Sequence, residues 1–181
     1  MAQSVELVLE APIEAAIRSE WDRLADAGLP SLQRSSAGPE HRPHITLFAA
    51  DAIPAEIDAA LPDLFARLDL TVRIGPLMVF GRRPGQLILV RAVAGSAGLM
   101  ELQARTAELC RADPVGQFGA GLWFPHVTYA RRMYSEQIGH AVRVIGADPN
   151  YLARVRHCRR WDGSRRTVRW LTQEPPRANF P

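Results

Sequence analysis

Lysine is absent from this sequence, because all 22 of its basic residues are arginine. ATP-dependent ligases that transfer a nucleotide form their covalent intermediate on a lysine side chain. That mechanism is therefore excluded for this chain, and a joining reaction in it has to proceed as the reverse of a phosphodiester opening.

Cysteine is scarce as well, with only Cys110 and Cys158 in the chain. They lack the close spacing of a zinc or redox motif, so we expect two reduced, buried thiols, with a disulfide as the alternative. The 5 histidines form no His-Glu-x-x-His pattern, and we predict no metal site. No apolar run approaches the ~20 residues of a membrane span, and the first residues lack the pattern of a signal peptide, so a cytoplasmic protein is expected.

The 181 residues are 47% hydrophobic and 23% charged, which is typical of a globular protein. We expect a single domain over residues 1–181, with N-terminal lobe elements up to about residue 93 and C-terminal lobe elements from about 94. The first part holds nine arginines and twelve acids, and the second thirteen arginines and seven acids. A phosphate-bearing partner is expected to meet the basic second part first, the alternative being a solvated basic face.

Two short stretches of the sequence are near copies of each other. His44-Ile45-Thr46 returns as His126-Val127-Thr128, and each copy follows a proline. Successive side chains of a strand point to opposite faces. Each copy is therefore predicted to present an imidazole and a hydroxyl on one face, with apolar residues that anchor the strand on the other.

Two imidazoles and two hydroxyls in one cleft suit chemistry on a phosphodiester. One neutral histidine can take a proton from the attacking group while a protonated one gives a proton to the departing oxygen. The unperturbed histidine pKa of about 6.5 lets both forms coexist near neutrality. Threonine hydroxyls can donate to the non-bridging phosphate oxygens, and the scheme needs no metal. The alternative is that both triplets are ordinary strand residues.

The elements around the two copies repeat. Val5 precedes His44 by 39 residues and Ile88 precedes His126 by 38, each time across a predicted strand, helix and loop. The expected fold is α+β and bilobal about a pseudo-twofold axis, with two antiparallel sheets, outer helices and a central cleft. Besides the two motif strands, we predict strands near 5–9, 70–80, 87–93, 153–161 and 167–171 and helices near 12–28, 54–68, 97–111 and 135–146.

The paired motifs resemble those of the 2H phosphoesterase superfamily, specifically the bacterial 2'-5' RNA ligase-like branch of RNA 2',3'-cyclic phosphodiesterases. Its signature is two H-x-[ST] motifs separated by about half a chain. Phe80-Gly81 resembles the end of a family strand, and Arg131 matches the arginine that often follows the second motif. Many relatives place a phenylalanine five residues after the first histidine, where this chain has Ala49, with Phe48 one place earlier.

The resemblance implies a metal-independent and cofactor-independent hydrolase, an RNA 2',3'-cyclic 3'-phosphodiesterase that opens cyclic phosphate ends to a 2'-phosphate. It also implies a possible reverse 2'-5' ligation without ATP. His44 and His126 are the implied catalytic acid and base, in an order that both motifs leave open. Thr46, Thr128 and Arg131 are the implied phosphate contacts.

Further substrate contacts are expected from Phe124, on the face of His126, and from Arg42, at the end of a long loop that starts at Gly28. His41, in the same loop, is expected on the surface. RNA ends or cyclic nucleotides are the expected partners of a monomer that is not bound to a membrane. Two alternatives stay open: a cyclic phosphodiesterase for small nucleotide or ADP-ribose cyclic phosphates, and a non-catalytic module that binds RNA ends.

Overall fold

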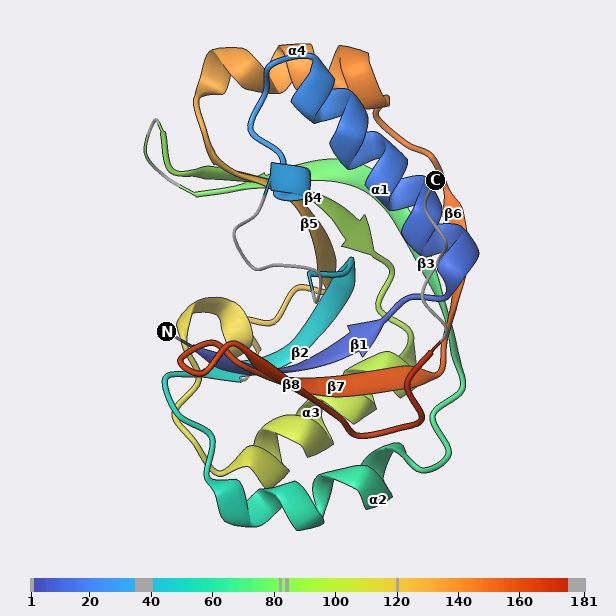
Figure 1. Ribbon diagram of the computed structural model, residues 1–181, viewed down its shortest axis with the longest axis vertical. Helices are drawn as coiled ribbons and strands as arrows, with labels where there is room; N and C mark the ends of the chain where they lie inside the picture. Colours follow the sequence, from blue (N-terminus) through green and yellow to red (C-terminus); the bar gives the residue numbers. More distant parts are fainter. Residues whose placement is uncertain (1, 35–40, 82, 84, 120, 176–181) are drawn as a thin grey trace.

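Eight strands form one antiparallel sheet in the order β6-β3-β4-β5-β2-β1-β7-β8 (Figure 1). The computed structural model describes residues 2–34, 41–81, 83, 85–119 and 121–175. The strands are β1 (Gln3–Val8), β2 (His44–Ala50), β3 (Leu70–Phe80), β4 (Leu87–Val93), β5 (His126–Met133), β6 (Tyr151–Val155), β7 (His157–Asp162) and β8 (Thr167–Trp170). The α-helices are α1 (Ala11–Asp26), α2 (Leu61–Phe65), α3 (Ala97–Cys110) and α4 (Ser135–Ile145).

The sheet consists of two matching halves, which we call the β2 half (β2, β1, β7 and β8) and the β5 half (β5, β4, β3 and β6). They meet where β2 pairs with β5, at the residue pair Ile45 and Val127. The expected α+β fold with two related antiparallel lobes is confirmed. The two expected sheets are continuous through this pair, so the two motif strands lie side by side at the centre of the molecule.

The halves are not successive in the chain. β3 and β4 precede residue 93 but pair in the β5 half, whereas β7 and β8 follow it and pair in the β2 half. This division differs from the expected lobe boundary near residue 93. β3 and β4 join the β5 half because β4 pairs with β5. β7 and β8 join the β2 half because the single strand expected at 153–161 breaks at Arg156 into β6, which pairs with β3, and β7, which pairs with β1.

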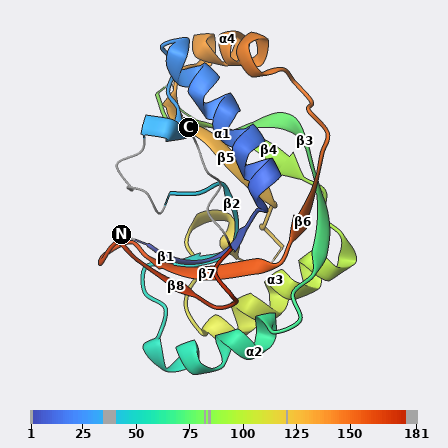
Figure 2. The ribbon, with the colours of Figure 1, turned by 45° about the vertical axis from the view of Figure 1, so that its right-hand side comes forward.

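The long helices also cross between the halves. α1 follows β1 but packs with α4 over the β5 half, while α3 follows β4 but packs against β2, beside α2 (Figures 1 and 2). The buried face of α1 holds Ile17, Trp21 and Leu24 together with two glutamates, and that of α3 holds Leu99 and Cys110 together with a glutamine and a threonine. Each fully buried leucine or isoleucine contributes about 1.5–3 kcal/mol, so neither half is complete without a helix from the other.

Two elements are interrupted at prolines. The second predicted helix is divided near Pro62 into a 3-10 turn, Ala55–Ala59, and the short helix α2. β3 changes register between Ile74 and Leu77, across its Gly-Pro pair. Both cysteines are free and buried, as expected. Among the described residues, no helix has the length and apolar character needed to cross a bilayer.

Candidate active site

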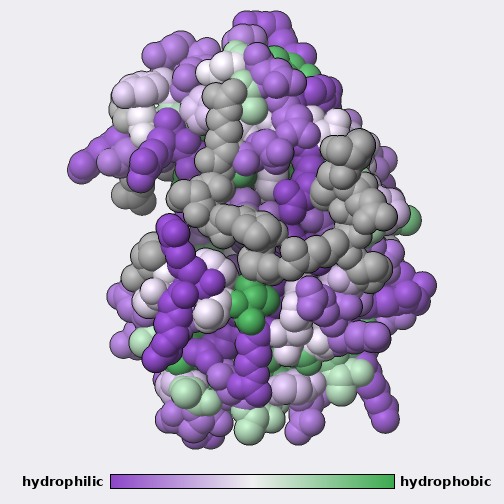
Figure 3. Space-filling model, in the orientation of Figure 1, coloured by the Kyte–Doolittle hydropathy of each residue, from purple (hydrophilic) through white to green (hydrophobic). Residues whose placement is uncertain are grey.

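The two His-x-Thr triplets face the same side of the sheet. Ile45 and Val127, which pair across the junction of the halves, are fully buried and point to the helices. Their neighbours therefore point the other way, and all four are half-buried: His44, Thr46, His126 and Thr128. Continuing the antiparallel register by one residue places His44 opposite Thr128 and Thr46 opposite His126. The surface is hollowed between the two halves (Figure 3).

Both imidazoles are held in the same tautomer. His44 Nδ1 lies 2.7 Å from the carbonyl oxygen of Arg42, and His126 Nδ1 lies 2.7 Å from that of Phe124. A carbonyl oxygen can only accept, so each Nδ1 carries a hydrogen and donates it. Each carbonyl belongs to the residue before a proline, which is restricted to extended conformations. The repeated proline thus helps to fix the ring, and each Nε2 is left available for chemistry.

A bulge after each motif sets which residues follow on the site face. Val5 pairs with Phe48 and Glu6 with Thr46, so β2 has one extra residue there. β5 has the same insertion, because Leu89 pairs with Ala130 and Val90 with Thr128. A bulge interrupts the alternation of side chains. Two successive residues of each strand are consequently buried, Leu47-Phe48 and Tyr129-Ala130.

Arg131 returns to the site face after the bulge in β5. It is exposed, and it forms no hydrogen bond or ion pair with any residue that the structure describes. Its positive charge is close enough to act on both imidazoles, where it adds to burial in lowering the pKa of His44 and of His126. Ala49 occupies the equivalent place in β2, and Phe48 is buried, so that phenylalanine has no exposed face for a substrate.

Arg131→Ala is expected to raise KM for a phosphodiester by about 10-fold or more, because a hydrogen bond to a charged group contributes about 1.5–3 kcal/mol. Steady-state kinetics measure the change. Arg105→Ala is the matched control, since Arg105 is an exposed arginine on the outer surface of α3. Equal effects of the two substitutions would show that Arg131 contributes only to the general charge of the protein.

The His44 side of the site is charged. Glu6 on β1 is buried, and its Oε2 accepts a hydrogen bond of 2.9 Å from Nε of Arg159 on β7. Its Oε1 accepts one of 2.6 Å from the hydroxyl of Ser4 and lies 3.7 Å from Nε2 of His44. Burial by itself would raise the pKa of Glu6, but His44, Arg159 and these hydrogen bonds together lower it to about 2. Glu6 is therefore ionised beside the imidazole.

The His126 side is aromatic. The Phe80 ring, at the end of β3, meets the His126 ring edge to face with 5.0 Å between centroids, and it contacts Phe124 at 6.3 Å. Phe124 is 41% exposed, which leaves it open to a ligand. The amide nitrogen of Gln117 lies 3.5 Å from Nε2 of His126, to which it can donate because Nδ1 already carries a hydrogen. Burial, the largest influence, lowers the pKa of His126.

Two residues of the preceding loop take roles that the sequence does not reveal. Arg42 is buried, and its Nε donates to Glu14 on α1 over 2.9 Å, while its carbonyl oxygen accepts from Nδ1 of His44. His41, expected on the surface, stacks on Trp21 at 5.4 Å and meets the His44 ring edge to face at 6.2 Å. Burial lowers the pKa of His41 to about 3, so it packs against His44 as a neutral ring. Residues 35–40 of this loop lie outside the described residues.

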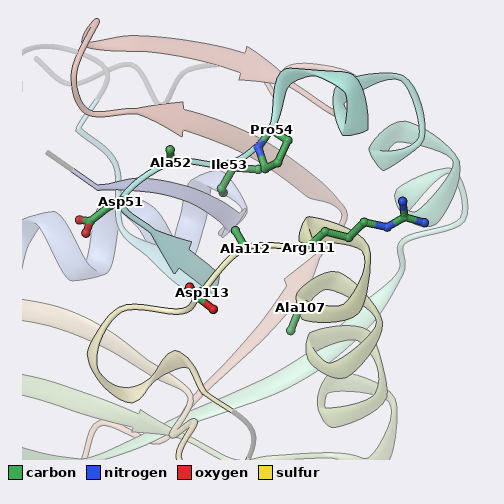
Figure 4. Close-up of a pocket in the computed structure, with 8 residues that line it drawn as sticks. All are labelled: Asp51, Ala52, Ile53, Pro54, Ala107, Arg111, Ala112 and Asp113. Atoms are coloured by element: carbon green, nitrogen blue, oxygen red, sulfur yellow. The ribbon is translucent and has the colours of Figure 1, made fainter.

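A separate pocket of about 680 Å³ lies between the end of β2 and the C-terminal end of α3 (Figure 4). It is lined by Asp51, Ala52, Ile53, Pro54, Ala107, Arg111, Ala112 and Asp113. None of the motif residues reaches it. Within the described part of the chain, no group of three or more His, Cys, Asp or Glu side chains is placed to hold a metal ion.

The sequence profile of the 2'-5' RNA ligase superfamily matches residues 12–166. The chain belongs to this superfamily. Membership in the 2'-5' RNA ligase superfamily, whose fold is that of the 2H phosphoesterases, supports a phosphoesterase with a role in RNA processing. No curated protein sequence matches the chain.

Solved structures share this fold over nearly the whole chain. Kluyveromyces marxianus Usb1 is 15% identical with a TM-score of 0.61, over 94% of this chain and 97% of that one. TT0787 of Thermus thermophilus is 18% identical with a TM-score of 0.57, over 96% of each chain. E. coli LigT, complexed with ATP, is 16% identical with a TM-score of 0.56, over 96% of this chain and 95% of that one.

Proposed function

We propose that this protein is a metal-independent phosphodiesterase that opens 2',3'-cyclic phosphate ends of RNA to a 2'-phosphate. The observation that supports this most is that the two imidazoles carry a hydrogen on the same nitrogen, Nδ1. His44 and His126 face the same side of the sheet, and each donates from Nδ1 to a carbonyl oxygen. Two Nε2 atoms are then available to one phosphate, one to accept a proton and one to donate it.

The reaction balances with two histidines and water. The water oxygen attacks phosphorus while its proton passes to the neutral Nε2, and the bond from phosphorus to O3' breaks. O3' takes a proton from the protonated Nε2 of the other histidine, which leaves a 2'-phosphate and a free 3'-hydroxyl. Hydrogen bonds from Thr46, Thr128 and Arg131 stabilise the charge on the non-bridging oxygens. An RNA 5'-hydroxyl in place of water gives a 2'-5' linkage without ATP.

A nucleoside fits the aromatic side of the site. Phe124 exposes a ring beside His126, and stacking of a base on an aromatic side chain contributes about 1–3 kcal/mol. Among the structures of similar fold, Kluyveromyces marxianus Usb1 was solved with uridine monophosphate and E. coli LigT with 3'-AMP. These complexes support a nucleotide as the ligand of the equivalent site here.

The test is to incubate the protein in EDTA with an oligoribonucleotide that ends in a 2',3'-cyclic phosphate, and to identify the product isomer. We expect the 2'-phosphate at a rate that EDTA does not change. A 3'-phosphate product, or loss of activity in EDTA, contradicts the proposal. Cyclic phosphates of mononucleotides and of ADP-ribose, assayed in parallel, separate the small-molecule alternative, and a tight complex that is never hydrolysed indicates a binding module.

A further inference from the structure

We propose that Glu6 decides which histidine is the acid, by favouring a proton on His44 over one on His126, so that His126 is left to act as the base. The catalytic part of this inference, the division of acid and base roles, rests on the proposed function. The interaction between Glu6 and His44 can be measured without any turnover.

The first argument is the orientation of the carboxylate. Arg159 approaches Glu6 from β7 with two nitrogens, Nε and Nη2, and both lie 2.9 Å from Oε2. The other oxygen, Oε1, accepts the hydroxyl hydrogen of Ser4 and lies 3.7 Å from Nε2 of His44. One oxygen is therefore neutralised by the guanidinium, and the other faces the imidazole with a free lone pair.

The second argument is that the two halves of the sheet differ at this position. Glu6 is the β1 residue opposite Thr46, and the equivalent residue in the β5 half is Val90, opposite Thr128. His126 therefore has an aliphatic side chain where His44 has a carboxylate. An anion within about 4–6 Å favours the protonated form of a histidine. The pseudo-twofold symmetry is thus broken by one charge.

The other charges near His44 do not favour protonation of His44 over protonation of His126. Arg131 and His126 on β5 face it, but Arg131 lowers the pKa of both histidines. Arg159 on β7 also opposes protonation of His44, although its guanidinium is paired with Oε2 of Glu6. His41, which packs on the ring, is neutral. Among the groups that act on these two imidazoles, the Glu6 carboxylate is the one that favours a charged His44 over a charged His126.

Glu6 is a positioning residue, since it acts through His44. A protonated His44 has two N–H groups, one held by the Arg42 carbonyl and one on Nε2 that faces Glu6 and the substrate. The second group gives its proton to O3', while Nε2 of His126 takes the proton of the attacking water. The pH profile then falls on the alkaline side as His44 loses its proton and on the acid side as His126 gains one.

Titration of the two imidazoles by NMR in the free protein tests the interaction itself. In the native chain His44 is expected to titrate at a higher pH than His126. In Glu6→Gln the pKa of His44 should fall by about 1–3 units, while that of His126 moves much less. Glu20→Gln is the matched control, because Glu20 is also buried and paired with an arginine, Arg91, but lies away from both histidines.

An unchanged His44 pKa in Glu6→Gln, or a His44 that titrates below His126 in the native chain, would overturn the inference. The native measurement needs no variant, so it decides the question even where Glu6→Gln fails to fold. In active Glu6→Gln enzyme, the alkaline limb of the kcat profile should move to lower pH by the same amount, with the acid limb in place. A merely structural role would lower kcat without moving the limb.

A phosphodiester with a p-nitrophenyl leaving group tests the role assignment, because p-nitrophenolate departs without a proton. His44→Ala should then recover to within about 10-fold of native activity, while His126→Ala stays impaired by about 10²-fold or more. The reverse pattern, or equal losses, would overturn the assignment. If the native protein hydrolyses no phosphodiester, the proposed function fails, and the titration still decides whether Glu6 controls His44.

Discussion

His44→Ala and His126→Ala are each expected to lower kcat on a 2',3'-cyclic phosphate end by about 10²-fold or more. Each substitution removes one of the two Nε2 atoms that the reaction needs for proton transfer. The effect should fall on kcat more than on KM, because proton transfer contributes in the transition state and little to binding. Steady-state kinetics on an oligoribonucleotide substrate measure both quantities.

Folding should survive these substitutions, since both rings are half-buried and neither belongs to the apolar core. His140→Ala is the matched control: His140 is an exposed histidine on α4, and its loss should leave kcat unchanged. Thr46→Ala and Thr128→Ala should be milder, because the phosphate keeps its other donors. Full activity in either catalytic histidine variant, with an intact circular dichroism spectrum, would contradict the assignment.

Arg91→Met is expected to lower the free energy of unfolding by about 3–5 kcal/mol. Arg91 is 0% exposed and donates to Glu20 on α1 over 3.0 Å. It also donates to the carbonyl oxygens of residues 145, 146 and 147, at the end of α4 and just after it. The substitution removes the buried cation from Oε2 of Glu20, whose Oε1 keeps only the half-exposed Arg23 at 3.6 Å and the Tyr151 hydroxyl. It also removes the link between β4, α1 and the end of α4. Urea denaturation measures the loss.

An exposed ion pair provides the comparison. Arg154 pairs with Asp69 at the surface, where the arginine side chain is 48% exposed, and Arg154→Met should cost far less stability than Arg91→Met. The double variant Arg91→Met with Glu20→Gln should be more stable than Arg91→Met alone, because no buried carboxylate then depends on the half-exposed Arg23 as its only cation. If Arg91→Met lowers the free energy of unfolding no more than Arg154→Met does, the packing of α1 over the β5 half does not depend on the Arg91 contact.

The sequence predicts the central strands well because two regular signals agree there. Alternation in the two triplets predicts which side chains share a face, and the repeat predicts that two such strands come from related units. His44 and His126 accordingly face the same side of the sheet, next to the pair Ile45 and Val127. Helix α1 and strands β3 and β4 lie where their apolar spacing predicts them.

Strict alternation fails after the triplets, where the bulges insert one residue. Counted from His126, Arg131 belongs to the core face, yet the bulge at Tyr129-Ala130 returns it to the site. The signal in the sequence is a pair of successive apolar residues, Leu47-Phe48 and Tyr129-Ala130, where alternation requires a polar one. A bulge can therefore be inferred from each pair, but only once both strands are known to be half-buried.

Long-range pairing is harder to predict than local structure. The stretch 153–161 has one continuous strand pattern, and its break at Arg156 depends on which strands offer free edges, β3 for one part and β1 for the other. Glu6 shows the same limit at the site. A single acid within the apolar stretch 5–9 is a visible signal, but its partners His44 and Arg159 lie 38 and 153 residues away in the chain.

The central claim is that His44 and His126 act on one phosphorus atom from opposite sides. A crystal structure of the protein with uridine and vanadate tests it most directly, because the complex imitates five-coordinate phosphorus. We predict a hydrogen bond from Nε2 of His44 to one apical oxygen and from Nε2 of His126 to the other, with Thr46 and Thr128 on the equatorial oxygens. A vanadate that touches only one imidazole, or that binds away from both, would contradict the account.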